Sequence, residues 1–220
     1  VSLLSANDIP VARAEISIPR VGRGVADLVL ASGSGPGPGE PVVLRWQDGG
    51  TMRYTCLTAQ RWRGWWQARL VAGAGRLNRV LPNRYYEGIA AETVARDILN
   101  EAGERPGKID LPGVLTRYVR RAGPAYQQLA VLISGYPRMW RILSDGSVWI
   151  GQDAEAAIEP IAITEARPAE RSYTVELSPQ IAPGAAMRGI IDGEPINLGV
   201  IERVRHIVGP KLRTEVYCAY

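Results

Sequence analysis

Residues 42–58 read VVLRWQDGGTMRYTCLT and are the strongest signal for local structure in this chain. Two apolar runs, Val42 to Trp46 and Met52 to Thr58, lie on either side of the turn Asp48-Gly49-Gly50. Because glycine supplies the positive φ that tight hairpin turns require, this pattern predicts two antiparallel strands. The run from Trp65 to Val71 predicts a further strand after them.

The residues before this hairpin also favour strands. Ala14 to Ile18 alternates apolar and polar side chains, and Val25 to Leu30 is a short apolar run. Residues 32–39, SGSGPGPG, form a turn-rich loop that cannot pack a core. Five short strands within about 60 residues predict a small barrel or sandwich, and we assign residues 1–86 to it, as a barrel.

The middle of the chain changes to a helical period. Its apolar residues recur on one helix face, at Ala91, Val94, Ala95, Ile98, Leu99 and Ala102. Gly103 is expected to end this helix in the left-handed conformation. A second helix is predicted from Pro124 to Gly135, and a hairpin from Trp140 to Ile150. Residues 87–155 are therefore predicted to form a small α+β insert.

The last third returns to strands. The runs 171–177, 187–191, 197–208 and 212–220 all have strand character, and Gly209-Pro210 separates the last two. Residues 156–220 are therefore predicted to form a second small barrel. The expected fold class is β-rich α+β, with two small β-barrels flanking a small α+β insert.

The bulk composition is that of a folded protein with a mixed surface. Of 220 residues, 46% are hydrophobic and 22% are charged, with a net charge of +4. We find no secretory leader and no apolar run of membrane-spanning length, so we expect folding in a cytoplasm and no membrane partner. Cys56 and Cys218 lack metal-site spacing, and the sequence leaves open whether either forms a disulfide.

Residue patterns for catalysis are weak. His206 is the only histidine, and it shares a predicted strand face with Val200, Val204 and Val208, as a satisfied core histidine does. The carboxylates Glu92, Asp97, Glu101, Glu104 and Asp145 all have ready structural roles. Gly73 and Gly75 resemble part of a phosphate loop, but no GK[ST] follows them. We expect no enzyme activity, catalytic residues, cofactor or metal.

The most suggestive cluster is residues 60–69, QRWRGWWQAR. Basic side chains interleaved with aromatic ones are typical of single-strand nucleic-acid platforms, with bases stacking on Trp62 or Trp65. The same composition suits a hairpin that packs in the barrel or between subunits. The nearly balanced charge argues against nucleic acid as a partner.

The order barrel, insert, barrel resembles the baseplate hub proteins of contractile-tailed phages. That group includes the late control protein D family and the hub part of type VI secretion spikes. The first segment that carries the likeness is residues 18–22, followed by the glycine-rich loop and residues 41–46. The second is residues 86–88, the helix from Glu92 to Gly103 and the hairpin 140–151. The third comprises Leu177, Pro183-Gly184, Gly189, Ile196, Val204-Arg205-His206 and residues 212–216. Nothing in the chain resembles a fused lysozyme or needle.

The resemblance implies a structural subunit of the virion tail or baseplate that forms a homotrimeric ring. In the family, three subunits with two barrels each adapt a six-fold tail tube to a three-fold spike. The implied partners are the tail tube protein, the central spike protein and the tape measure protein. The residues expected at subunit contacts are Trp62, Arg63, Trp65, Trp66, Val204, His206, Val216 and Tyr220.

Two other functions stay open from the sequence. The first is a single-stranded nucleic-acid-binding barrel protein that uses Trp62, Arg63 and Trp65. Its binding would weaken steeply with salt. The second is a cell-wall hydrolase with a carboxylate pair distant in the sequence.

Overall fold

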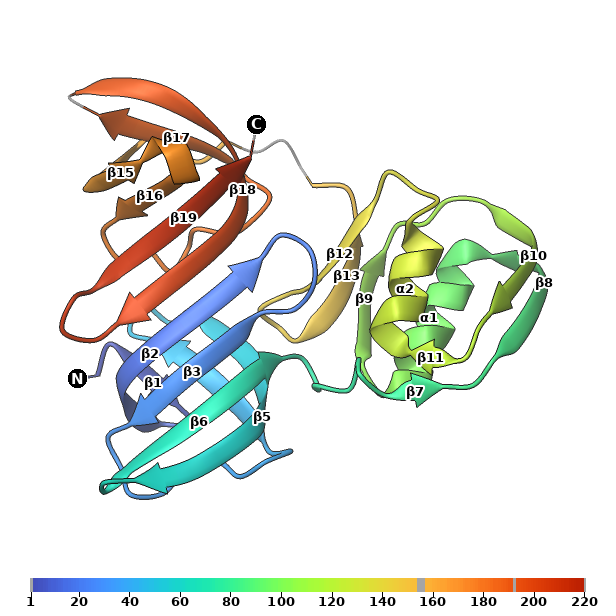
Figure 1. The fold of residues 1–220 in the computed structure, drawn as a ribbon, viewed down its shortest axis with the longest axis horizontal. Helices are drawn as coiled ribbons and strands as arrows, with labels where there is room; N and C mark the ends of the chain where they lie inside the picture. The colour runs from blue at the N-terminus through green and yellow to red at the C-terminus, as the bar shows by residue number, and fades with distance from the viewer. Residues whose placement is uncertain (1, 154–156, 192, 220) are drawn as a thin grey trace.

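The computed structural model describes residues 2–153, 157–191 and 193–219. They form two β-barrels side by side and a smaller α+β unit, which lies on the right in Figure 1. This arrangement confirms the predicted fold class.

The first barrel is built from six antiparallel strands. They are β1 (Leu4–Ala6), β2 (Ile9–Pro19), β3 (Val25–Leu30), β4 (Pro41–Trp46), β5 (Thr51–Trp62) and β6 (Trp65–Ala72). They pair in the order β1-β4-β5-β6-β3-β2, and β1 also pairs with β2, which closes the barrel. In β4 the side chains of Val42, Leu44 and Trp46 are buried and Arg45 is exposed, as the strand alternation requires. The predicted hairpin at residues 42–58 is therefore confirmed.

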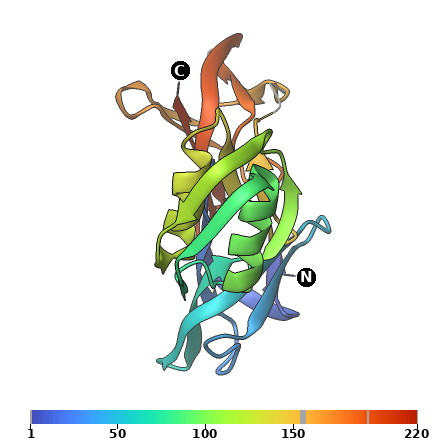
Figure 2. The same ribbon diagram turned by 90° about the vertical axis from the view of Figure 1, so that its right-hand side faces the viewer.

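The α+β unit consists of two helices and three small sheets. Its elements are β7 (Val80–Leu81), β8 (Arg84–Ala90), α1 (Ala91–Ala102), β9 (Arg105–Ile109), β10 (Val114–Arg120), β11 (Gly123–Pro124), α2 (Ala125–Ile133), β12 (Met139–Ile142) and β13 (Ser147–Gly151). In Figure 2 this unit faces the viewer, and the ribbon of β8 and β10 crosses in front of the helices. The predicted boundary between residues 86 and 87 falls inside β8.

The two helices follow the predicted apolar pattern closely. All six residues predicted on the inner face of α1 are buried, and Gly103 ends it with a φ of 87°. The second helix, α2, ends at Ile133, before the predicted stop at Gly135. Ser134 retains a right-handed conformation there, and its hydroxyl donates a hydrogen bond to the Val131 carbonyl.

The second barrel contains the remaining elements. They are β14 (Ile161–Ala162), β15 (Glu165–Arg167), the 3-10 turn η1 (Pro168–Glu170), β16 (Ser172–Val175), β17 (Ala186–Ile191), β18 (Glu194–Val208) and β19 (Arg213–Ala219). The ladder runs β17-β18-β19-β16-β15, and β14 pairs with β17. The segment 161–167 thus pairs with β17 at its start and with β16 at its end, which links both edges of the ladder.

One strand pair joins the barrels. β2 of the first barrel lies antiparallel to β18 of the second, from Ala14 opposite Val208 to Pro19 opposite Arg203. This pairing makes one twelve-stranded sheet out of both barrels. The apolar side chains nevertheless form two separate cores. One core is shared by the first barrel and the α+β unit, and the other belongs to the second barrel.

Candidate contact surfaces

The β5–β6 hairpin ends in an exposed aromatic tip. Trp62 and Trp65 lie opposite each other, and the turn between them consists of Arg63 and Gly64, whose φ values are 49° and 85°. Two consecutive positive φ values are typical of the two-residue hairpin turn whose twist matches that of the strands. Trp62 is 53% exposed and Trp65 is 46% exposed. The Arg63 guanidinium lies 5.4 Å from the Trp62 ring centre. Trp62, Arg63 and Trp65 are thus available for contact.

Trp66, the fourth hairpin residue predicted to contact another subunit, faces the other way. It follows Trp65 in the strand, so its side chain packs against the core of the first barrel. Its indole Nε1 donates a 3.2 Å hydrogen bond to the Pro36 carbonyl oxygen. Trp66 therefore holds the glycine-rich loop against the barrel end; its side chain is only partly buried, and its place at an interface stays a prediction.

Three further residues predicted to contact another subunit are buried inside this one. Val204 and Val216 are 0% exposed and His206 is 1% exposed. These residues lie on the inward face of β18 and β19, where they pack within the chain itself. The expectation that their side chains form an intersubunit surface is corrected accordingly. Tyr220, the last predicted contact, lies outside the described residues.

His206 is a core histidine with a side-chain partner. Its Nδ1 lies 3.0 Å from the Thr214 hydroxyl, which itself accepts a hydrogen bond from the Ser178 amide. The Trp46 ring packs edge-on against the imidazole, with 5.7 Å between ring centres. Burial lowers the pKa of His206 to about 4, so the ring is neutral near pH 7.

The outward side chains of the same strands form ion pairs across the seam between the barrels. Arg205 of β18 pairs with Glu15 of β2 at 2.7 Å and with Glu215 of β19 at 3.0 Å. Arg213 pairs with Glu215 at 2.9 Å. Burial raises the pKa of Glu215, but the hydrogen bonds and charges of Arg213 and Arg205 outweigh it and hold the pKa below its ordinary value.

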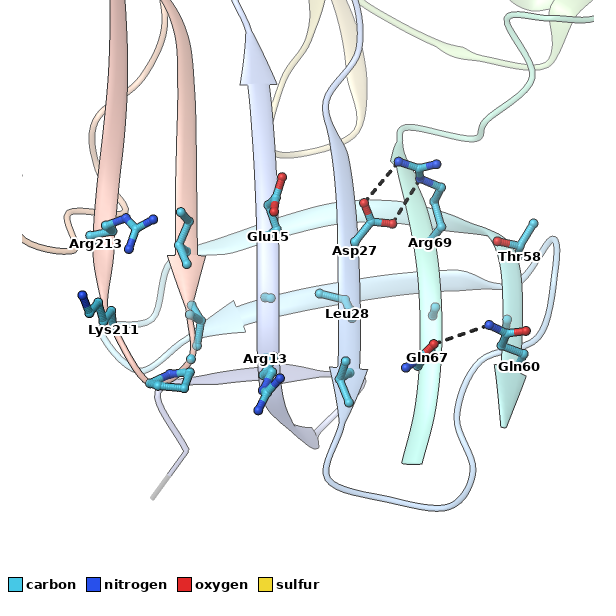
Figure 3. A pocket seen from close by; sticks show the side chains of 18 residues that line it. Arg13, Glu15, Asp27, Leu28, Thr58, Gln60, Gln67, Arg69, Lys211 and Arg213 are labelled. Carbon is cyan, nitrogen blue, oxygen red and sulfur yellow. Dashed lines mark hydrogen bonds and ion pairs between the residues drawn. The ribbon is translucent and has the colours of Figure 1, made fainter. Parts of the chain in front are cut away.

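This outer face is hollowed next to the seam. A hollow of about 870 Å³ extends over β19, β18, β2, β3, β6 and β5. Figure 3 shows its labelled side chains, which are almost all polar: Arg13, Glu15, Asp27, Leu28, Thr58, Gln60, Gln67, Arg69, Lys211 and Arg213. Asp27 and Arg69 pair across neighbouring strands at 3.1 Å. The lining between these side chains is largely apolar and includes Ala14, Val29, Ala59, Ala68, Ile207, Val208 and Pro210. We call this surface the seam face; it carries charges of both signs and extends across both barrels.

The glycine-rich bend at residues 73–75 binds an anion of its own chain. Gly73 and Gly75 have φ values of 76° and 73°. The amides of Ala74 and Arg76 donate hydrogen bonds of 2.9 and 2.6 Å to the carboxylate of Glu104, which is 4% exposed. Successive amides in such a bend form an anion-binding concavity. Glu104 occupies it and ties the α+β unit to the first barrel.

The other carboxylates considered for catalysis also have partners within the chain. Their contacts are Glu92 with Arg96, Asp97 with Arg84, Glu101 with Arg84 and Arg120, and Asp145 with Ser147 and Arg105. The hydrogen bond from the Ser147 hydroxyl is the main cause that lowers the pKa of Asp145. These acids stabilise turns and helix contacts.

A second carboxylate cluster joins all three parts of the chain. Asp153 is nearly buried and accepts hydrogen bonds from Arg20 at 2.7 Å and from Arg141 at 2.5 Å. Arg20 also pairs with Glu202 of β18. A Cβ at Gly184 would approach the Asp153 carboxylate to 2.5 Å, so the 184 position requires glycine. Asp153 therefore holds β2, the β12–β13 hairpin and the second barrel together.

Within the described ranges, no group of three or more histidine, cysteine or acidic side chains is placed to bind a metal ion. No helix in the described part of the chain is long and apolar enough to cross a membrane. Cys56 and Cys218 are both buried free thiols.

Solved structures that are similar to this chain include two tail proteins and a secretion component. The 43 kDa tail protein of prophage MuSo2 from Shewanella oneidensis matches with a TM-score of 0.72 and 11% identity, over 97% of this chain and 95% of that chain. The tail protein from Neisseria meningitidis MC58 matches with a TM-score of 0.71 and 13% identity, over the same shares of the two chains.

The third similar structure is the E. coli c3393 protein. It is described as a component of the type VI secretion system with structural similarity to the T4 bacteriophage tail proteins gp27 and gp5. The match has a TM-score of 0.72 and 11% identity, over 99% of this chain and 77% of that chain. No protein-family model and no curated protein matches the sequence. At these identities the comparisons establish a shared fold, and this fold covers nearly the whole chain.

Proposed function

We propose that this chain is a structural, non-enzymatic subunit of a phage-type tail. In this proposal three copies form a baseplate hub ring around the axis of a contractile tail. The ring adapts a six-fold tail tube to a three-fold central spike and encloses the tape measure protein. The proposal places the protein in the virion tail, after assembly in the host cytoplasm.

The observation that carries the proposal is the pairing of β2 with β18. It builds two barrels of one chain into a single sheet, in a fold shared with phage tail proteins over 97% of the chain. Three copies of such a chain place six barrels around one axis. A three-fold assembly thereby presents six similar units to a six-fold tube, which is the geometry that an adaptor needs.

The seam face is the best candidate for the inner wall of the ring. It spans both barrels, it is hollowed, and it carries charges of both signs, of which Asp27 with Arg69 and Glu15 with Arg205 are paired across strands. We therefore assign the seam face to the axis. The α+β unit lies beside the barrels and is assigned to contacts with other tail components.

Native mass spectrometry of the purified chain tests the proposal. We expect a species of three times the mass of the chain. A chain that stays monomeric at tens of micromolar, and also fails to bind tube and spike proteins, would contradict it.

A second function is favoured by one observation, the exposure of Trp62 and Trp65 beside Arg63. Exposed aromatic rings flanked by arginine are suited to stack single-stranded bases. Fluorescence titration with a labelled oligonucleotide at 50 and 200 mM salt, roughly the range where counterion release is strong, separates the two functions. Tight, salt-sensitive binding by a monomer would favour nucleic-acid binding.

A further inference from the structure

Two hairpins project from opposite ends of the two-barrel body. The β5–β6 hairpin extends from the end of the first barrel and lies at the bottom of Figure 1, and the β17–β18 hairpin extends from the second barrel at the top. Each hairpin extends beyond the end of the strand that pairs with its outer edge. The backbone of β4 and of the residues just before it pairs with β5 only as far as Cys56, and β19 pairs with β18 only from Val200 onward.

Each hairpin therefore has a free backbone edge. In the described part of the chain, residues 58–62 of β5 pair with β6 alone, and residues 194–198 of β18 lie beside β17 alone. An uncovered strand edge exposes unpaired amides and carbonyls and readily recruits another strand. The two edges lie at opposite ends of the molecule, so one copy cannot cover its own.

Both hairpins also expose apolar side chains. Leu57 and Trp62 of β5 are 41% and 53% exposed, and Ile196 of β18 is 38% exposed. Large exposed aromatic and aliphatic residues on a projecting element are typical anchors of protein interfaces. A free strand edge with exposed apolar side chains beside it therefore favours contact with another protein.

The charges of the two hairpins are complementary. The sequence contains no acidic residue from 49 to 86, and Arg61 and Arg63 at the β5–β6 tip are exposed. The β17–β18 hairpin exposes Glu194 at its tip, opposite Ile191, whereas its Arg188 lies farther from the tip. A basic tip at one end and an acidic tip at the other favour head-to-tail contact and disfavour contact between like ends.

We propose that the β5–β6 hairpin of one copy binds the β17–β18 hairpin of the next copy. The free edges pair as strands, Trp62 packs against Ile196, and Arg61 and Arg63 lie near Glu194. Such a contact is heterologous, so repetition around an axis closes a ring when the rotation allows. The inference rests on the proposed function and names the surfaces through which its copies meet.

Charge reversal tests this contact in the intact protein. The Arg61→Glu/Arg63→Glu variant should raise the dissociation constant for self-association at least tenfold in sedimentation velocity, and Glu194→Arg should weaken it likewise. Combining the three changes should restore at least part of the association. The matched control is Arg45→Glu/Arg79→Glu, which makes the same charge change at exposed positions away from both tips and should associate like the wild type. Circular dichroism checks that every variant is folded.

A cross-link provides a second measurement. An Arg61→Cys chain mixed with a Glu194→Cys chain should form a covalent dimer under mild oxidation, and neither single variant should form that species alone. A wild-type ring whose assembly ignores the charge reversals and gives no cross-link would overturn the hairpin contact but leave the proposed function standing. A wild-type chain that does not self-associate would overturn the hairpin contact, and it would overturn the proposed function as well if the chain also failed to bind tube and spike proteins.

Discussion

Replacement of His206 gives the most quantitative test of how this chain is packed. The chain has one histidine, and it is 1% exposed, between the Thr214 hydroxyl and the edge of Trp46. The Thr214 hydroxyl oxygen accepts the Ser178 amide, so its proton is free to be donated to Nδ1 of a neutral imidazole. Burial lowers the pKa of His206 from 6.5 to about 4. Between these two pKa values the imidazole therefore binds a proton in the unfolded chain but stays neutral in the folded protein.

This difference in pKa predicts how stability changes with pH. Between pH 6.5 and about 4 the unfolded chain binds more protons at this site than the folded chain, so the free energy of unfolding rises with pH there. The contribution of His206 is fully present above pH 6.5 and is lost as the pH falls to about 4. One pKa unit corresponds to about 1.4 kcal/mol, so the loss amounts to about 3 kcal/mol near pH 4 and about 2 kcal/mol at pH 5.

The assay compares the wild type with a His206→Gln variant, which can still accept the Thr214 hydrogen bond but does not titrate. Denaturant unfolding followed by circular dichroism, at one protein concentration from pH 7.5 to 4.5, gives the free energies. Carboxylates affect both proteins equally, so the difference between the two curves isolates His206. We expect the wild type to lose about 2 to 3 kcal/mol more than the variant over this range.

A direct measurement can refute the reasoning. Because the chain has one histidine, its imidazole signals in a proton–nitrogen NMR spectrum need no assignment. A midpoint near 6.5 in the folded protein, or parallel stability curves for wild type and variant, would show that His206 is not held in a dry core.

Three further outcomes follow from other contacts. Asp153→Ala leaves Arg20 and Arg141 without their shared partner and should cost about 2 to 4 kcal/mol in denaturant unfolding, whereas Asp27→Ala at an exposed pair should cost under about 1 kcal/mol. Glu104→Ala removes the acceptor of two amides and should cost about 1 to 3 kcal/mol, and Glu104→Gln less, in the same assay. Burial raises the pKa of Cys218 to about 11, so this thiol should react far more slowly with a disulfide reagent at pH 8 in the folded than in the unfolded chain; equal rates would contradict its burial.

Local patterns made the elements of this fold predictable. The Asp48-Gly49-Gly50 turn and the spacing of apolar residues along α1 each involve neighbours in the sequence, and both are confirmed. The strand pairings that close the barrels and join them instead bring together residues that are far apart in the sequence. Ala14 to Pro19 lies opposite residues 203–208, and no local pattern specifies that partner. The resemblance to hub proteins, rather than periodicity, indicated that the barrels adjoin.

The contact residues were less predictable than the elements. Val204, His206 and Val208 alternate in the sequence as they do in the structure, but alternation alone does not tell whether that side faces the chain's own core or another subunit. A bulge at Glu202 shifts the register, so that both Ile201 and Val204 face inward. Past the bulge, Val204 and His206 are core residues, and the side chains between them face out. The sequence did contain a signal for the outward face of β18 and β19, namely the charged residues that alternate with the apolar ones, above all Arg205 and Glu215.

The central claim is that copies of this chain surround an axis with the seam face turned inward. Electron cryomicroscopy of the assembled particle tests it most directly. We expect six barrels from three chains around a central passage, with Glu15 and Arg205 on the wall of that passage. A ring with the seam face on its outside, or a particle without a passage, would contradict the account.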